Sequence, residues 1–189
     1  MEANNYQDSL IYINIRFCLW KEGLPKFRWN SELVRKLEIN SYRADEILKI
    51  EGQRVNENEI RLLIDVFNLT EEEFQLTNLL NSSSHDVLRE NLNYLINSNS
   101  THGEKKVLAS RLGVENGTIS RWLNGTRRPV KDEQEEFKRI FSVKPSYNLE
   151  KDPIFMSYEY FGFNEIIEWG NQRKERVVES FDVIRRLIG

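Results

Sequence analysis

Apolar residues recur at the spacing of an α-helix along almost the whole of this 189-residue chain. They follow one another three or four positions apart, which places them on one face of a helix. The clearest series are Ile11, Ile15 and Leu19; Leu33, Val34 and Leu37; Ile60, Leu63, Ile64 and Phe67; Leu88, Leu92, Leu95 and Ile96; Leu108 and Leu112; and Phe137, Ile140 and Phe141. No convincing β-strand alternation of apolar and polar residues occurs before residue 145. We therefore predict an all-α fold.

Short polar segments with helix-capping chemistry separate the predicted helices. Three pairs fit or resemble the capping box at a helix start: Asn56 with Glu59, Thr70 with Glu73, and Thr101 with Glu104. The run of small polar residues at 81–84 can form a linker or a helix N-cap, so we place a domain boundary there and a second one near Pro145. The expected domains are therefore residues 1–84, 85–145 and 146–189.

Charge is distributed unevenly among these segments. The whole chain has 27 basic and 30 acidic residues, a net charge of −3, which by itself disfavours a nucleic-acid partner. Residues 1–84 carry 10 basic and 14 acidic side chains, residues 85–145 carry 11 and 8, and residues 146–189 carry 6 and 8. Only the middle segment is basic, so the totals conceal one region suited to phosphate.

The sequence lacks the residues and motifs that several functional classes require. Cys18 is the single cysteine and the two histidines are far apart in sequence, so the chain cannot supply the four ligands of a structural zinc site. No phosphate-binding loop, serine-hydrolase elbow or zinc-protease motif is present. Acidic clusters such as 71–73 and 133–136 fit solvated helix faces or first turns. We expect that the protein is not an enzyme and binds no metal or cofactor. Because the sequence has no apolar run of about 20 residues, we also expect a cytoplasmic protein without membrane contact.

Residues 105–129 contain the most specific pattern in the chain. Ala109 is small where a second helix must cross closely, and Gly113 permits the positive φ that ends a helix. Val114, Ile119 and Trp122 then fall on one face, and we expect Trp122 in the core. Four polar residues are left facing outward, namely Asn116, Thr118, Ser120 and Arg121. The pattern predicts two short helices joined by a tight turn.

Residues 88–143 resemble the helix-turn-helix domain of the lambda-repressor and Cro type, the XRE family. The resemblance rests on the small residue four before Gly113, on Ile119 with Trp122, and on the tail of Gly125, Arg127 and Pro129. It implies that a recognition helix near Asn116–Asn124 enters the major groove of double-stranded DNA.

The resemblance also assigns roles to individual residues. It makes Asn116, Thr118 and Arg121 the base-reading residues. Phosphate contacts are expected from Lys105, Asn124, Thr126, Arg127 and Arg128. Gly117 departs from the polar residue that is common at its position. Two alternatives stay open, because Arg121 can simply pair with Glu115, and Asn116 can simply cap the helix.

Residues 10–74 resemble the same domain in a degenerate form, which predicts a tandem arrangement. Residues 33–39 align with 108–114, and residues 45–48 align with 120–123. Gly113 is replaced by Glu38, and Asp45 and Glu46 place acid on the expected recognition helix. This copy therefore either reads DNA weakly through Tyr42, Arg43 and Lys49 or uses these residues to contact protein, and we favour protein contacts or an auxiliary DNA role.

The C-terminal part combines an irregular aromatic stretch with one predicted helix over residues 164–188. Its apolar stripe follows spacings of four, three and four, through Val177, Phe181, Ile184 and Ile188. Such a stripe docks on the chain's own domains or on a second copy, and a homodimer would match paired operator half-sites. The favoured function is a sequence-specific transcriptional regulator, most simply a repressor. The alternative is an antitoxin or defence-system component that binds a protein partner through its acidic first domain or its C-terminal helix.

Overall fold

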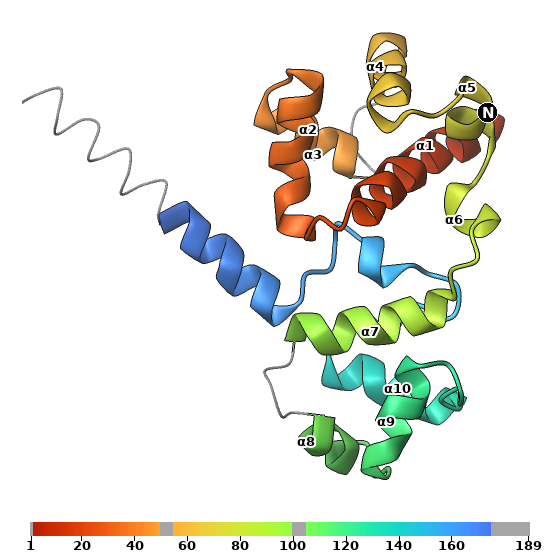
Figure 1. Ribbon diagram of the computed structural model, residues 1–189, viewed down its shortest axis with the longest axis vertical. Coiled ribbons are helices and arrows are strands. Elements are labelled where there is room, and N and C mark those ends of the chain that lie inside the picture. Colours follow the sequence, from red (N-terminus) through yellow and green to blue (C-terminus); the bar gives the residue numbers. More distant parts are fainter. Residues whose placement is uncertain (1, 50–54, 100–104, 175–189) are drawn as a thin grey trace, which may run out of the picture.

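The computed structural model describes residues 2–49, 55–99 and 105–174, and every regular element in these ranges is a helix (Figure 1). The prediction of an all-α fold is confirmed. The α-helices are α1 (Glu2–Lys21), α2 (Trp29–Leu37), α3 (Ser41–Leu48), α4 (Glu57–Phe67), α5 (Glu71–Leu76), α6 (Leu79–Ser82), α7 (Val87–Asn99), α8 (Lys105–Arg111), α9 (Asn116–Leu123) and α10 (Lys131–Ile140). Two 3-10 helices, η1 (Lys26–Arg28) and η2 (Ile154–Met156), and a helix over residues 163–174 complete the described part.

The buried side chains form two hydrophobic clusters. The first is built on α1, where Ile15 and Leu19 pack with Trp29 and Leu33 of α2 and with Leu63 of α4. The second is built on α7 and contains Leu92, Ala109, Ile119, Trp122 and Phe137. We call residues 2–82 the first half and residues 87–157 the second half. In Figure 1, α7 lies between the helices of the first half and helices α8 to α10.

One buried asparagine has the same role in each half. Asn14 on α1 donates from Nδ2 to the carbonyl oxygens of Phe74 and Thr77, both at 2.8 Å, and its Oδ1 accepts from the backbone N–H of Leu79 at 3.0 Å. A completely buried amide that makes all of these bonds fixes the last helices of the first half against its first helix.

Asn91 on α7 repeats this pattern in the second half. It donates to the carbonyl oxygens of Leu149 at 2.8 Å and Asp152 at 2.9 Å and accepts from the N–H of Phe155 at 3.1 Å. The chain after α10 thus closes the second core as α5 and α6 close the first, although it does so with turns and the short 3-10 helix η2 where the first half forms α-helices.

Left-handed backbone also recurs at matching points. The chain turns after α2 at Glu38, with φ of 54°, and after α8 at Gly113, with φ of 66°. A second pair follows α4 and α10, at Asn68 with φ of 51° and Ser142 with φ of 55°. The two halves therefore share a sequence of helices, left-handed turns and buried amide bonds.

Lys26 joins the two halves. It lies in η1, and its completely buried Nζ donates to the carbonyl oxygens of Ser157 at 2.8 Å, Ile154 at 3.3 Å and Tyr160. The ammonium group also lies 4.2 Å from the ring centre of Tyr94 on α7. Burial lowers the pKa of Lys26 from its usual 10.5 to about 7, while the nearby carboxylate of Glu165 opposes this shift.

The structure adjusts several expectations about boundaries. The polar run at 81–84 is not only a linker, because Asn81 and Ser82 form the end of α6. The capping boxes of Asn56 with Glu59 and of Thr70 with Glu73 are both present. The third pair lies outside the described residues, and so do Val177, Phe181, Ile184 and Ile188 of the predicted stripe. The stretch after Pro145 is irregular as expected, but Leu149 and Ile154 are buried in the second cluster.

Candidate nucleic-acid interface

The α8–α9 pair has a tight turn with a small residue at its crossing point. The chain leaves α8 through Gly113, whose φ of 66° favours glycine, and the N–H of Val114 returns to the carbonyl oxygen of Ala109 at 2.9 Å. Ala109 has no solvent-exposed surface, so a larger side chain would push α9 away from α8. These contacts fix the direction in which α9 presents its surface.

The inner face of α9 is apolar and holds the helix in the second core. Ile119 and Trp122 are buried, and the indole of Trp122 meets the ring of Phe137 on α10 edge-on, with ring centres 6.3 Å apart. Trp122 therefore lies in the core, as the sequence predicts. Its Nε1 lacks a hydrogen-bond partner among the described residues, which leaves hydrophobic packing as its contribution.

Thr118 does not face outward, contrary to the expectation from sequence. Only 2% of its surface is exposed, and its Oγ1 accepts from the guanidinium of Arg121 at 3.0 Å. A hydroxyl in this position cannot reach a base edge while it supports the arginine. We therefore remove Thr118 from the base-reading residues and describe it as a side chain that positions Arg121.

Asn116 is the first residue of α9 and is exposed. The preceding residue, Glu115, occupies the N-cap position without a side-chain capping bond, so the alternative that Asn116 serves as the cap does not hold. No hydrogen bond involves the Asn116 side chain among the described residues. Its carboxamide is thus free at the end of α9 that enters the groove in helix-turn-helix complexes.

Arg121 is exposed and lies one turn after Gly117 on α9. Its guanidinium donates to the Gly117 carbonyl oxygen at 3.3 Å, and it forms an ion pair with Glu115 at 3.4 Å. The pairing that the sequence left open is therefore present. Because both side chains are largely exposed, this ion pair is worth little and can exchange for a base or phosphate contact.

The residues expected to contact phosphate differ in how free they are. Lys105 is exposed at the start of α8. Asn124 and Thr126 bond to each other, because the Asn124 Oδ1 accepts from the N–H of Thr126 at 3.0 Å and from its Oγ1 at 2.7 Å. Arg127 pairs with Glu133 at 3.3 Å, and Arg128 pairs with Asp86 at 2.7 Å.

The ion-pair partners of Arg127 and Arg128 are not predicted by the sequence, for two different reasons. Glu133 was interpreted only as a first-turn acid of α10, although its carboxylate also accepts from the N–H of Val130 at 2.7 Å. Asp86 lies 42 positions before Arg128, so no local pattern could connect them. Both carboxylates hold arginines of the candidate surface in place when no ligand is bound.

The equivalent surface of the first half is arranged differently. Arg43 on α3 is not available for a ligand, because its side chain is only 17% exposed and donates to both carboxylate oxygens of Glu59 on α4, at 2.7 and 2.6 Å. The Glu59 carboxylate raises the pKa of Arg43 further above its ordinary range. The DNA or protein contact that the sequence predicts through Arg43 would require this pair to open, whereas Tyr42 and Lys49 are already exposed.

No protein-family model, curated protein or solved structure matches this chain. In the described ranges, no group of three or more histidine, cysteine or acidic side chains is placed to hold a metal ion. In the same ranges, no helix is both long and apolar enough to cross a membrane. The candidate site consequently rests on the geometry and charge of the second half.

Proposed function

We propose that this protein is a sequence-specific double-stranded DNA-binding transcriptional regulator, and specifically a repressor. The observation that carries the proposal is that α9 presents two exposed side chains able to read bases, the carboxamide of Asn116 at its first position and the guanidinium of Arg121. This helix is held by a tight turn within the one basic segment of the chain. An asparagine pairs with adenine through two hydrogen bonds, and an arginine pairs with guanine in the same way.

The remaining contacts follow from the same orientation. With α9 in the major groove, Lys105 at the start of α8 and the arginines at 127 and 128 after α9 are suited to phosphates on either side. Both arginines then exchange a carboxylate partner for a phosphate. A repressor of this kind needs no chemical step, because its occupation of an operator excludes polymerase.

The experiment starts from a site selected by the intact protein from random duplex DNA, with affinity measured by fluorescence anisotropy across a salt series. Replacement of Asn116 and Arg121 together by alanine is expected to weaken specific binding by at least about fivefold for each lost base contact. The matched control is Arg139→Ala, which removes the same charge from an exposed position on α10. Its affinity should change little.

Two results would contradict this function. Binding that does not weaken as salt rises would exclude phosphate contacts, since released counterions make such binding salt-dependent. Unchanged affinity and sequence preference in the double variant would show that α9 does not read bases. A fold measurement by circular dichroism on each variant separates these outcomes from unfolding.

A second candidate function is the binding of a protein partner by the first half, as in an antitoxin or defence-system component. It is favoured by the exposed phenol ring of Tyr42 on α3, the helix that also carries Asp45 and Glu46, and by the acidic balance of residues 1–84. Acid on this face repels phosphate but suits a basic protein surface. Co-purification of the Tyr42→Ala variant and the unmodified chain from the native host tests this candidate, which fails if both retain the same proteins.

A further inference from the structure

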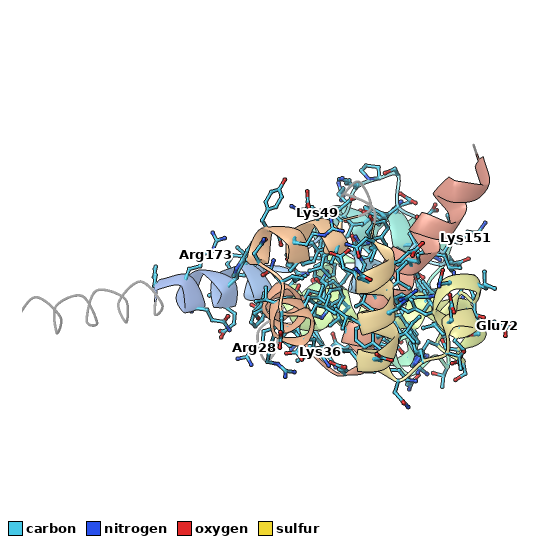
Figure 2. All side chains as sticks on the ribbon, turned by 90° about the horizontal axis from the view of Figure 1, so that it is seen from above. Arg28, Lys36, Lys49, Glu72, Lys151 and Arg173 are labelled. Atoms are coloured by element: carbon cyan, nitrogen blue, oxygen red, sulfur yellow. The ribbon has the colours of Figure 1, made fainter. Side chains whose placement is uncertain are left out.

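The helix over residues 163–174 has a broad apolar face in solvent. Phe163 is 61% exposed, Ile166 54% and Ile167 46%, and Trp169 is exposed as well. A surface helix of a globular protein normally places such residues against the core and leaves polar residues outside. Figure 1 shows the helix projecting from the body, and Figure 2 shows Arg173 on this projecting part.

The opposite face of this helix is the one that contacts the body. Glu165 is buried, and its carboxylate accepts from the Tyr94 hydroxyl on α7 and from the N–H of Gly162 at 3.0 Å. Phe163 and Ile167 each lie two residues from Glu165, which is about 200° around a helix of 3.6 residues per turn. The docking of this helix therefore turns Phe163 and Ile167 away from the body, while Trp169 stacks on the ring of Phe161 with ring centres 5.8 Å apart.

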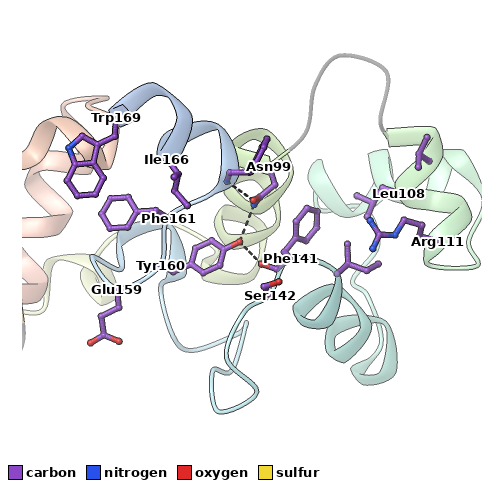
Figure 3. Close-up of a pocket in the computed structure, with 13 residues that line it drawn as sticks. Asn99, Leu108, Arg111, Phe141, Ser142, Glu159, Tyr160, Phe161, Ile166 and Trp169 are labelled. Atoms are coloured by element: carbon purple, nitrogen blue, oxygen red, sulfur yellow. Dashed lines mark hydrogen bonds between the residues drawn. The ribbon is translucent and has the colours of Figure 1, made fainter. Parts of the chain in front are cut away.

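A groove of about 880 Å³ runs beside this face (Figure 3). One wall is formed by Phe163, Ile166 and Trp169, and the other by Val107 and Leu108 of α8 with Ile140 and Phe141 at the end of α10. Tyr160 forms part of the floor, where its hydroxyl donates to the Phe141 carbonyl oxygen at 2.7 Å. The groove thus has two mainly apolar walls, and Asn99, Arg111, Ser142 and Glu159 are its polar lining residues.

The sequence continues the same stripe beyond the described residues. Phe163 and Ile167 begin a series with alternating spacings of four and three that passes through Gly170 and Lys174 and reaches Val177, Phe181, Ile184 and Ile188. Residues 171–188 contain no glycine or proline to reverse the chain. Because this stretch has no residue that favours a reversal of the chain, we take the partner of the apolar face from another molecule.

We propose that residues 177–188 of a second copy of this chain pack on the exposed apolar face of the helix over residues 163–174, beside the groove and antiparallel to that helix. The exchange is reciprocal and gives a closed dimer with twofold symmetry. An alignment that places Ile167 opposite Ile184 also places Gly170 opposite Phe181, where an added Cβ at residue 170 would meet nothing within 4 Å. A parallel alignment would instead bring the two Lys174 side chains together.

The first test measures the mass of the intact protein by light scattering after gel filtration. We expect twice the 22.5 kDa of one chain for the unmodified protein and for the control Gln172→Glu, which adds a carboxylate on the same helix on the side opposite Phe163. The Ile166→Asp, Ile167→Asp double variant and a chain that ends at Lys174 should both be monomers with unchanged helix content. A monomeric unmodified protein, or a double variant that stays dimeric, overturns the proposal.

The second test identifies the occupant and its direction. Two proteins in a Cys18→Ala background carry one new cysteine each, Ile167→Cys in one and Ile184→Cys in the other. After mixing and mild oxidation, the proposal requires a disulfide-linked dimer in the mixture and none in either protein alone. A link within one chain when both cysteines are combined would instead assign the apolar face to the chain's own C-terminal segment.

This dimer does not depend on DNA binding, and the two proposals fail separately. If both are correct, the monomeric variant keeps its preference for a single half-site and loses the gain in affinity on a duplex with two half-sites. If only the DNA proposal fails, the mass measurements still show a dimer.

Discussion

The two halves share a backbone plan but differ in the charges on the equivalent helix. On α3, Glu46 stands in the place that Arg121 takes on α9. The cation of α3, Arg43, is bound into a half-buried ion pair with Glu59, while Arg121 holds only an exposed and exchangeable pair. The comparison shows that the frame of helices and turns is set by buried contacts, and that the same frame carries equivalent helices with different charges.

The largest expected effect comes from removing the buried asparagine hydrogen bonds that hold each half together. Asn91→Leu keeps a branched side chain of the same length but leaves the Leu149 carbonyl oxygen and the Phe155 N–H buried without partners. Each such group costs about 1 to 3 kcal/mol, so we expect a loss of about 3 to 5 kcal/mol in the free energy of unfolding. Asn14→Leu should cost a similar amount in the first half. Urea denaturation measures both, and a loss below about 1 kcal/mol in either variant would contradict the equivalence.

Lys26, which joins the two halves, should make the free energy of unfolding depend on pH. The folded chain holds the pKa of Lys26 at about 7, below its usual 10.5, because the ammonium group is buried. Between these two values the unfolded chain keeps a proton that the folded chain releases, so stability rises with pH. The slope should approach about 1.4 kcal/mol per pH unit and disappear below pH 7. Denaturation of the Lys26→Met variant is the control, and a slope that survives in this variant would assign it to another group.

Substitutions at the left-handed turns after α2 and α8 should change the free energy of unfolding by smaller amounts and with opposite signs. Glu38 takes a φ of 54° that glycine adopts without strain, so Glu38→Gly should raise the free energy of unfolding by about 0.5 to 1 kcal/mol. Gly113→Ala should lower it by about 1 kcal/mol, since an added Cβ meets no neighbour there and only the backbone is strained. Changes of the same sign in the two variants would show that the two turns are not equivalent.

Local patterns predicted most of the helices, but they could not predict partners that are distant in sequence. Helical periodicity and capping pairs located α4 and α5, because both signals lie within a few residues. The buried amides had a weak signal, since Asn14 and Asn91 each interrupt an apolar series at the same point, three residues after Ile11 and Leu88.

The errors in the candidate site have the same cause. Thr118 was expected to face outward because a polar residue on an amphipathic helix usually does, and only the packing of α9 shows that it is buried. Arg43 was assigned to a ligand because Glu59, sixteen residues later, gave no local sign of pairing with it. Lys26 was not singled out at all, since its acceptors lie more than 125 positions further along the chain.

The smallest expected effect concerns the acid at the start of α9. The carboxylate of Glu115 is largely exposed, pairs with Arg121 and lies where a phosphate or base edge would approach. Glu115→Gln removes this charge and releases Arg121, so DNA affinity should increase by a few fold at low salt, with a smaller gain at high salt where exposed charges are screened. Glu150→Gln removes the same charge from an exposed position outside α8 and α9 and serves as the control. If Glu115→Gln weakens binding, then Glu115 itself contacts the DNA, for example by accepting from cytosine, and the difference between α9 and α3 does not lie in net charge alone.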